Sequence, residues 1–522
     1  MLSGGRTITR RWPNDSNHAE RLSAPRDDLL LESTATDDVD GTADAASGTL
    51  TTSTELRFHQ ESGPFTAYER TVAVERDELV ERTRYHLRIP WFGWVFQTPV
   101  RKVLARKWRA NGWWAPPDRL DPTQVLVLGL LAAASMSAAF VNTLFTQTVN
   151  FAADEFGVSD TAIGIAGAVV RAGIVIALPA AIVADRIGRR RVIIAVAWLG
   201  PVLSLLGALA PTFPVLVATQ TLARPMGIAL AFLVGVVAAE EMPRNSRAYA
   251  VSVLAMAAGF GAGIAVLSLR LADIGESGWR LVYLVAAIWC LVALDLSRRL
   301  PETRRFDAAE IEASERPPRL DRGRLGLLAA VAFLGNIFVA AASFFQNNYL
   351  TDIRDFSGGA IGIFSIVVGT PAALGLIIGG RIADTAGRRR LIAIAYPVST
   401  AFVVGAFAVG PPMLFAFALF GGLFGSAAYP ALAVYRAELF PTHNRSRAAG
   451  LITAAALIGG IIGLVATGWL LDQGWSYAAV MSTLAVGPAL VTLLVIAAFP
   501  ETAHLELEEL NPEDKPVDLS GL

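Results

Sequence analysis

The chain has 522 residues, of which 53% are hydrophobic and only 17% are charged. Several soluble domains of this total length would need more charge to cover their surfaces, so the composition argues against a soluble multidomain enzyme. The formal net charge of −1 gives no reason to expect a nucleic-acid partner. A single cysteine excludes a disulfide framework and a Cys-based zinc site. We therefore expect neither an enzyme nor a bound metal or other cofactor.

The first part of the chain, residues 1–65, is rich in Ser, Thr, Ala and Asp and poor in large apolar side chains. Its acidic residues include a cluster at Asp37, Asp38, Asp40 and Asp44. Such a segment buries too little apolar surface to offset the entropy lost on ordering. We expect residues 1–65 to form a disordered polar tail.

Residues 66–123 carry more basic and aromatic side chains and are expected to form a cytoplasmic juxtamembrane segment. Val100, Val103, Leu104 and Trp108 follow helical spacing, and five Lys and Arg residues between 101 and 109 take the other faces. This pattern is typical of a helix that lies on an anionic membrane surface. A solvated linker is the alternative.

From residue 124 onward, long apolar runs alternate with short polar breaks. A helix rises 1.5 Å per residue and needs about 20 apolar residues to cross a bilayer. We count twelve such runs, at 125–150, 159–183, 191–211, 213–239, 248–271, 280–297, 325–350, 359–383, 390–409, 412–437, 449–471 and 478–498. The sequence thus predicts an all-α membrane protein with six-helix bundles at 124–299 and 325–499, a central cytoplasmic loop at 300–324 and a C-terminal tail at 500–522.

Arginine placement predicts the orientation of this protein in the membrane. Clusters such as 189–191 and 388–390 follow the even-numbered apolar runs, whereas the opposite loops hold few arginines. Because cytoplasmic loops are enriched in Lys and Arg, both termini are expected in the cytoplasm. We expect a monomeric, multi-pass protein of the plasma membrane, with the lipid bilayer as its partner.

Three motifs recur at nearly one offset along the chain. The Asp-containing turns after the second and eighth runs place Asp185 and Asp384 199 positions apart. A Glu-x-x-Pro-x-x-x-Arg element begins at Glu240 and again at Glu438, and a Pro-Glu-Thr element begins at 301 and at 500. Three motifs in register indicate that the chain contains two copies of a six-helix unit.

These motifs resemble those of the major facilitator superfamily. The family's G-x-x-x-D-R-x-G-R-R/K loop is matched from Asp185 to Arg190, with Ala181 in place of the first glycine. The second copy runs from Gly380 to Arg389, with Thr385 in place of the first arginine. The other two elements are most similar to the branch of sugar porters and metabolite–proton symporters. The resemblance covers about residues 124–502 and implies this family's fold and a transport function.

The charged motifs also suggest a mechanical role at the cytoplasmic side. Carboxylates there can pair with arginines or cap helix N-termini from another segment, and such contacts can break and re-form. The alternative is that the arginines only set the topology. The predicted cytoplasmic gate comprises Asp185, Arg186, Gly188, Arg189, Glu240, Arg247, Asp384, Gly387, Arg388, Glu438 and Arg445.

Polar residues inside the apolar runs are costly and mark a candidate substrate pathway. Arg171 and Arg224 lie near the middle of the second and fourth runs, with no acidic residue at comparable depth. We expect them to attract an anionic group of the substrate, or alternatively to bind carbonyl groups and water. The resemblance places the first, fourth and seventh helices around the cavity. The predicted pathway comprises Asn142, Gln147, Arg171, Gln220, Arg224, Asn336, Gln346 and Asn347.

The expected function is secondary active or facilitative transport of a small polar metabolite by alternating access. An organic anion is favoured over a sugar as the small-molecule substrate. Proton coupling at Glu240, Glu241, Asp185 or on the substrate itself, uniport and exchange all stay open. The missing G-x-x-x-x-G-K-[ST] motif disfavours an ATP-driven pump. A multidrug–proton antiporter and a non-transporting membrane sensor or scaffold are the alternatives.

Overall fold

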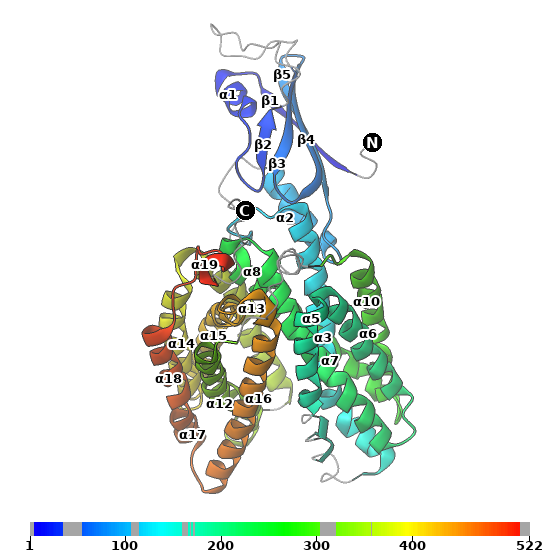
Figure 1. Cartoon of the computed structure of the whole chain (residues 1–522), viewed down its shortest axis with the longest axis vertical. Coiled ribbons are helices and arrows are strands. Elements are labelled where there is room, and N and C mark those ends of the chain that lie inside the picture. Colours follow the sequence, from blue (N-terminus) through cyan, green and yellow to red (C-terminus); the bar gives the residue numbers. More distant parts are fainter. Residues whose placement is uncertain are drawn as a thin grey trace, which may run out of the picture. The chain divides into compact units, whose positions relative to one another are not determined.

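The computed structural model describes residues 5–34, 55–105, 114–158, 165–167, 169–170, 173–302, 320–356 and 358–511. The chain divides into two compact units, Met1–Leu130 and Leu131–Leu522. Figure 1 labels the elements of each unit.

The first unit contains a five-stranded antiparallel sheet in the order β1-β5-β4-β3-β2. Its long β4–β5 hairpin turns at Arg76 and Asp77, both of which have positive φ, as tight two-residue hairpins require. The strands are β1 (Arg6–Pro13), β2 (Leu31–Thr34), β3 (Glu55–Ser62), β4 (Phe65–Glu75) and β5 (Glu78–Leu87).

Two helices complete the core of the first unit. Helix α1 (Ser16–Ser23) packs Ala19 and Leu22 against one apolar cluster of the sheet, around Phe58 and Val72. Helix α2 (Gly93–Ala105) packs Val100 and Leu104 against a second cluster, around Phe65, Tyr68 and Tyr85. Every second residue of β4 faces the same side of the sheet, and on one side these residues, 68, 70, 72 and 74, are all buried.

The prediction of a disordered tail over residues 1–65 is wrong for the described stretches 5–34 and 55–65. These stretches form β1, α1, β2 and β3. The physical reason lies in buried charge, because the Arg70 guanidinium is 2.6 Å from the Glu32 carboxylate and both side chains are 0% exposed. Some of the charged residues that make this segment polar, such as Glu32, are thus paired inside the core. The acidic cluster at 37–44 lies outside the described residues.

The prediction of an interfacial helix needs a correction as well. Helix α2 forms where the spacing of Val100 and Leu104 predicts it, but these side chains are only 3% exposed and pack on the sheet rather than facing lipid. Their neighbour Val103 packs against the same cluster. Trp108 lies outside the described residues. The helical periodicity was informative, and the surface that it buries belongs to the protein.

The second unit is helical, and its repeat begins within α3, which runs across the boundary of the two units. The helices of the first repeat are α3 (Pro122–Phe156), η1 (Gly173–Ile176), α5 (Ala177–Ile187), α6 (Arg189–Ala208), α7 (Phe213–Glu241), η2 (Arg244–Ser246), α8 (Arg247–Leu267), η3 (Ser268–Ile274), α9 (Trp279–Leu284) and α10 (Ala287–Arg299). We call residues 131–302 the N-half.

The second repeat follows the same order, and we call residues 320–511 the C-half. Its helices are α12 (Arg322–Asp352), α13 (Gly358–Ala386), α14 (Arg388–Ala406), α15 (Met413–Glu438), η4 (Thr442–Asn444), α16 (Arg445–Asp472), α17 (Tyr477–Leu484), α18 (Val486–Ala498) and α19 (Leu507–Leu510). Most of the expected central loop, residues 303–319, and of the C-terminal tail, residues 512–522, lies outside the described residues.

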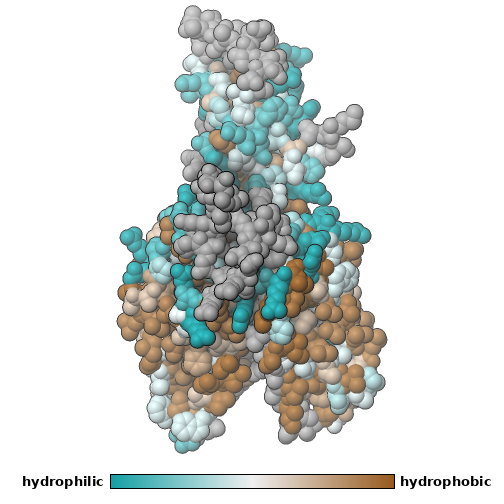
Figure 2. Space-filling model, viewed as in Figure 1, coloured by the Kyte–Doolittle hydropathy of each residue, from teal (hydrophilic) through white to brown (hydrophobic). Residues whose placement is uncertain are grey.

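Eleven helices in the described part of the chain are long and apolar enough to cross a membrane. They match eleven of the twelve predicted runs, and the remaining run, 159–183, contains residues that the structure does not describe. Large apolar side chains such as Leu206, Ile363 and Val465 are exposed on the helices. Figure 2 shows this apolar surface over both halves. The protein is thus built as a multi-pass membrane protein.

Small residues bring paired helices into close contact, as expected for helix packing in a membrane. A Cβ at Gly261 of α8 would collide with the backbone of Met136 in α3. At the corresponding place in the C-half, a Cβ at Gly459 of α16 would collide with the backbone of Phe333 in α12. The two halves therefore repeat a packing contact as well as a helix order.

Candidate functional site

Two aspartates cap helices of the opposite half. Asp384, near the end of α13, accepts hydrogen bonds from the backbone N–H groups of Ala248 (3.2 Å) and Tyr249 (2.9 Å) at the start of α8. Asp185, near the end of α5, accepts from the N–H groups of Ser446 (3.2 Å) and Arg447 (2.8 Å) at the start of α16. A carboxylate at a helix N-terminus satisfies unpaired N–H groups and complements the helix dipole. Each half thus holds one helix end of the other.

One arginine in each half connects these aspartates to a glutamate. Arg189 lies 3.2 Å from Asp185 and 3.4 Å from Glu240. Arg388 lies 3.0 Å from Asp384 and also pairs with Glu438. Each arginine begins the helix that follows a glycine turn. The glycines Gly188 and Gly387 have φ of 102° and 105°, a backbone conformation that residues with a side chain rarely adopt.

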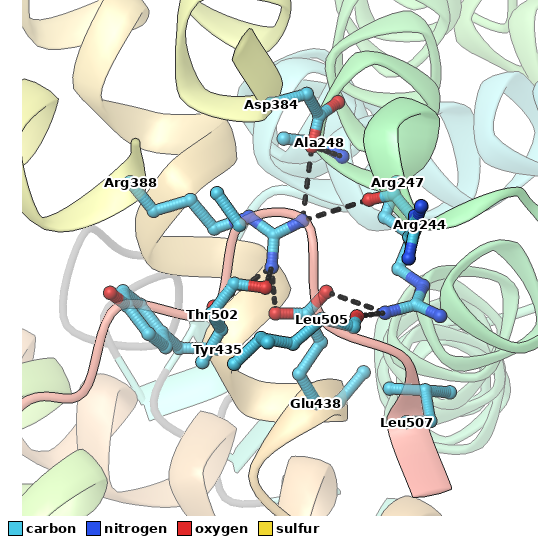
Figure 3. Close-up of polar contacts among 12 residues, drawn as sticks. Arg244, Arg247, Ala248, Asp384, Arg388, Tyr435, Glu438, Thr502, Leu505 and Leu507 are labelled. Atoms are coloured by element: carbon cyan, nitrogen blue, oxygen red, sulfur yellow. Dashed lines mark hydrogen bonds and ion pairs between the residues drawn. The ribbon is translucent and has the colours of Figure 1, made fainter. Parts of the chain in front are cut away.

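Two further ion pairs cross between the halves. Arg445 of α16 lies 2.8 Å from Glu240 of α7, and Arg247 of α8 lies 3.3 Å from Glu438 of α15. All four side chains are 0% exposed. Figure 3 shows the C-half arrangement, in which Glu438 lies between Arg388 and Arg247. Removing one member of a buried pair leaves an uncompensated charge and costs about 3–5 kcal/mol.

The glutamates of the two Pro-Glu-Thr elements accept hydrogen bonds from backbone N–H groups just after the same glycine turns. The carboxylate of Glu302 accepts from the N–H of Arg190 (3.1 Å), and that of Glu501 accepts from the N–H of Arg388 (2.9 Å). Arg388 also donates to the hydroxyl of Thr502 (2.8 Å). The motif that repeated in the sequence therefore anchors the start of α6 and of α14.

The segment after α18 adds contacts that the motif pattern does not predict. Arg247 of the N-half donates to the carbonyl of Leu505 (3.1 Å) and lies 3.3 Å from the Glu506 carboxylate. The amide of Asn511 donates to the carbonyl of Glu438 (2.7 Å). Residues 505–511 thus contact charged positions of both halves. The corresponding stretch of the first repeat falls within 303–319, outside the described residues.

We call the buried charges of this cluster the gate network. It consists of Asp185, Arg189, Glu240, Arg247, Asp384, Arg388, Glu438 and Arg445. Of the remaining predicted gate residues, the two glycines form the turns. Arg186 is exposed and makes no ion pair within the described part of the chain. The gating role of these residues stays a prediction.

Two neighbouring cavities lie beyond the gate network. The larger, of about 580 Å³, is lined by α12–α16 of the C-half. The smaller, of about 240 Å³, is lined by α3, α7 and α8 of the N-half and by α15 and α16 of the C-half. Figure 2 shows a hollow between the two halves at the lower end of the view, away from α19. The buried contacts of the gate network and this hollow thus lie at opposite ends of the two halves.

The predicted pathway residues occupy different places. Asn142 lines the smaller cavity, and Asn336 and Gln346 line the larger one. Gln220 is buried, Gln147 and Arg224 are half-buried, and none of the three lines either cavity in the described structure. Arg171 and the side chain of Asn347 lie outside the described residues. Substrate contact by all eight stays a prediction.

One charged residue at these cavities, Arg436 of α15, is not among the residues predicted from the sequence. It lines both cavities. In the sequence it precedes Glu438 by only two residues, so its position suggests one of the arginines of the predicted cytoplasmic side. Two residues on a helix are about 200° apart around the axis, so neighbours of this spacing face opposite ways. This rotation was the feature of the sequence from which a different environment for Arg436 and Glu438 could have been predicted.

Comparison with known proteins agrees with this architecture. A family model described as the Major Facilitator Superfamily matches residues 129–351 and 325–521. A "probable actinorhodin transporter" of Streptomyces coelicolor is 30% identical over 132 residues, which span 24% of this chain and 23% of the relative. The mouse "solute carrier family 2, facilitated glucose transporter member 8" is 29% identical over 214 residues, or 39% of this chain and 44% of the relative. The chain therefore aligns with less than half the length of each relative.

Solved structures share the fold over most of the second unit. The proton:xylose symporter XylE, bound to 6-bromo-6-deoxy-D-glucose, has a TM-score of 0.64 at 18% identity and covers 74% of this chain and 98% of its own. The human organic anion transporter MFSD10 has a TM-score of 0.58 at 16% identity, with 73% and 100% covered. FucP, in the outward conformation, has a TM-score of 0.59 at 16% identity, with 72% and 99% covered.

Proposed function

Because this chain belongs to the Major Facilitator Superfamily, we propose that it is a secondary transporter of a small polar solute that works by alternating access. It acts in the plasma membrane with both termini in the cytoplasm. The observation that carries this proposal is the pair of buried ion pairs across the halves, Arg445–Glu240 and Arg247–Glu438. Each of these four residues lies at the end of its helix, so the two ion pairs join the repeats at the helix ends.

The gate network suits a contact that forms and breaks. Its Coulomb attraction is strong while the charges are buried, but the same charges recover hydration once the halves separate, so the net difference between the two states is small. Each aspartate also keeps its own arginine, Arg189 or Arg388, when the cross-half bonds break, because these partners lie in the same half. The network can thus open without leaving the aspartates uncompensated.

For the substrate, we propose an organic anion ahead of a sugar. Similarly folded proteins include a proton:xylose symporter and an organic anion transporter, so the fold accommodates both classes. On the N-half side, Arg224 and Arg171 are the proposed contacts for an anionic group. Replacing Arg224 by Ala should abolish transport, and Arg224→Lys should weaken it severely, because lysine lacks the planar donor pair that fits a carboxylate.

For energy coupling, the gate carboxylates are the proposed proton sites. No Asp or Glu is present among the described residues that line the two cavities. Proton coupling would therefore act at Glu240, Glu241 or Asp185, whereas uniport and exchange need no such group. A drug–proton antiporter within this fold stays the alternative.

Flux into proteoliposomes tests the proposed function. Purified full-length protein is reconstituted, and uptake of radiolabelled sugars and organic acids is compared with that of protein-free vesicles. We expect saturable uptake of at least one compound, reduced by Asp185→Asn and by Glu240→Gln. Asp295→Asn is the matched control, because the one ion pair of Asp295 among the described residues is with Arg299 of its own helix (2.9 Å). A protein that binds a compound without moving it would be a sensor and would contradict transport.

A further inference from the structure

The two cavities share one charged lining residue, Arg436. The larger cavity, at about 580 Å³, falls within the range of small-molecule sites, roughly 300–1,000 Å³. Both cavities are lined by Tyr429, Ala433, Arg436 and Thr453 of α15 and α16, so they meet at this point. Among the described lining residues, Arg436 is the sole ionisable group apart from tyrosines.

Arg436 differs from the four buried arginines of the gate network. Arg189, Arg247, Arg388 and Arg445 each pair with an acidic side chain. Arg436 is half-buried and has no hydrogen bond or ion pair to any residue of the described chain. A guanidinium facing a cavity is tolerable while water fills it, but a solute that displaces this water must replace its hydrogen bonds. An oxyanion does so best, through two parallel charge-assisted bonds.

The surroundings of Arg436 define the remainder of the ligand. Tyr429 lies seven residues before it on the same face of α15, so the two are separated by about 10 Å along the helix. The wall of the larger cavity is otherwise mainly apolar and includes Phe338, Val403 and Phe407. The amide of Asn336 is engaged with the carbonyl of Ala456 (2.5 Å). Such a wall fits an apolar or aromatic body better than a ring of hydroxyl groups, which would need many acceptors.

We propose that Arg436 is a second anion subsite, additional to the N-half contacts proposed above, and that the solute is an organic anion with at least one carboxylate-like group and a mainly apolar body. The carboxylate binds Arg436 at the gate end of the cavity, and the body occupies the C-half cavity. This inference rests on the proposed transport function and names its substrate class. It also explains why Arg436 has no acidic partner in the described chain, since the ligand supplies the counter-charge.

Matched ligand pairs test this proposal on the purified full-length protein. The probes are phenylacetate and phenylacetamide, 2-naphthoate and 2-naphthamide, hexanoate and hexanamide, with xylose as a neutral sugar. Thermal stabilisation is titrated for the native protein, for Arg436→Gln and for Arg390→Gln. Arg390 is an exposed arginine of α14 at the same edge of the C-half and is the matched control.

We expect at least one carboxylate to bind the native protein with an apparent Kd about ten- to a hundredfold below that of its amide. Arg436→Gln should remove this preference, and Arg390→Gln should keep it. Arg436→Lys should retain the charge but weaken the preference severalfold, and it decides the matter if Arg436→Gln is not monodisperse.

The proposal is overturned if no carboxylate binds better than its amide, or if the preference survives in Arg436→Gln or is unchanged in Arg436→Lys. These outcomes are separable from failure of the transport function. Uptake of xylose without any anion preference would overturn the subsite and leave transport intact. Carboxylate binding that depends on Arg436 without flux would overturn transport and leave the subsite intact.

Discussion

Asp185 and Asp384 perform the same structural task in opposite directions. Asp185 of the N-half caps α16 of the C-half, and Asp384 of the C-half caps α8 of the N-half. Each carboxylate also lies beside the arginine four residues after it. The two repeats are therefore joined by reciprocal contacts, and the loss of either aspartate should weaken one specific helix end.

Hydrogen exchange can measure these two caps separately. In Asp384→Asn, the first-turn amides of α8 should exchange about tenfold faster, because a charged cap contributes on the order of 1–2 kcal/mol. The first turn of α16 should be unaffected, and Asp185→Asn should show the reverse pattern. Equal changes at both helices in either variant would mean that the caps act only through global stability. Asp295→Asn should alter neither helix.

The buried glutamates should show a larger effect than the aspartates. Glu240→Gln leaves Arg445 and Arg189 with less counter-charge in a buried site, at a cost of about 3–5 kcal/mol. We expect the thermal unfolding temperature in detergent to fall by several degrees. The double variant Glu240→Gln/Arg445→Gln should lose less than the sum of the two single variants. Additive losses would show that the pair has no energetic coupling.

The orientation of the protein can be tested by cysteine labelling. In a Cys290→Ala background, Asp154→Cys places a thiol at an exposed position near the end of α3, and Thr385→Cys places one at an exposed position near the end of α13. We expect a membrane-impermeant maleimide to label position 154 in intact cells and position 385 only after permeabilisation. The opposite pattern would place the arginine-rich side outside.

The sheet of the first unit depends on its buried charges. Arg70 lies 2.6 Å from Glu32 and 3.7 Å from Glu81, inside the core. Glu32→Gln in the full chain should expose β3 and β4 to limited proteolysis, since a broken buried pair costs about 3–5 kcal/mol. Arg82→Gln removes a surface pair with Glu75, worth about 1 kcal/mol or less, and is the control. Equal protease sensitivity of the two variants would contradict the role of Glu32.

The fold of the second unit was predictable because its signals are local. The length of each apolar run determines whether it crosses a membrane, and the repeat of Asp185 at Asp384 and of Glu240 at Glu438 sets the two halves in register. The first unit was not predictable in this way. Its order depends on Arg70 meeting Glu32, which are 38 positions apart and signal nothing when read alone.

The candidate site was predictable in its charges but not in its partners. The motifs identified Glu240 and Arg247, and only the structure shows that their partners, Arg445 and Glu438, belong to the other half. Arg436 was missed because its proximity to Glu438 in the sequence conceals that it lines the cavities. The rotation of the helix between positions 436 and 438 directs Arg436 to the cavities and Glu438 to the gate network. The spacing of the motif residues gives no information on this difference.

The central claim is that the gate network holds the two halves together reversibly. Spin labels at Arg244→Cys of the N-half and Thr385→Cys of the C-half, both exposed positions, report the separation of the halves beside the network in a Cys290→Ala background. The carbonyl of Arg244 that accepts from Arg388 (3.4 Å) is kept in this variant. Pulsed electron–electron double resonance should give two distances between the spin labels, a short one for most molecules and a longer one for a minority. Glu240→Gln and Glu438→Gln should each increase the share of molecules with the longer distance. A single short distance that neither substitution changes would contradict the gate.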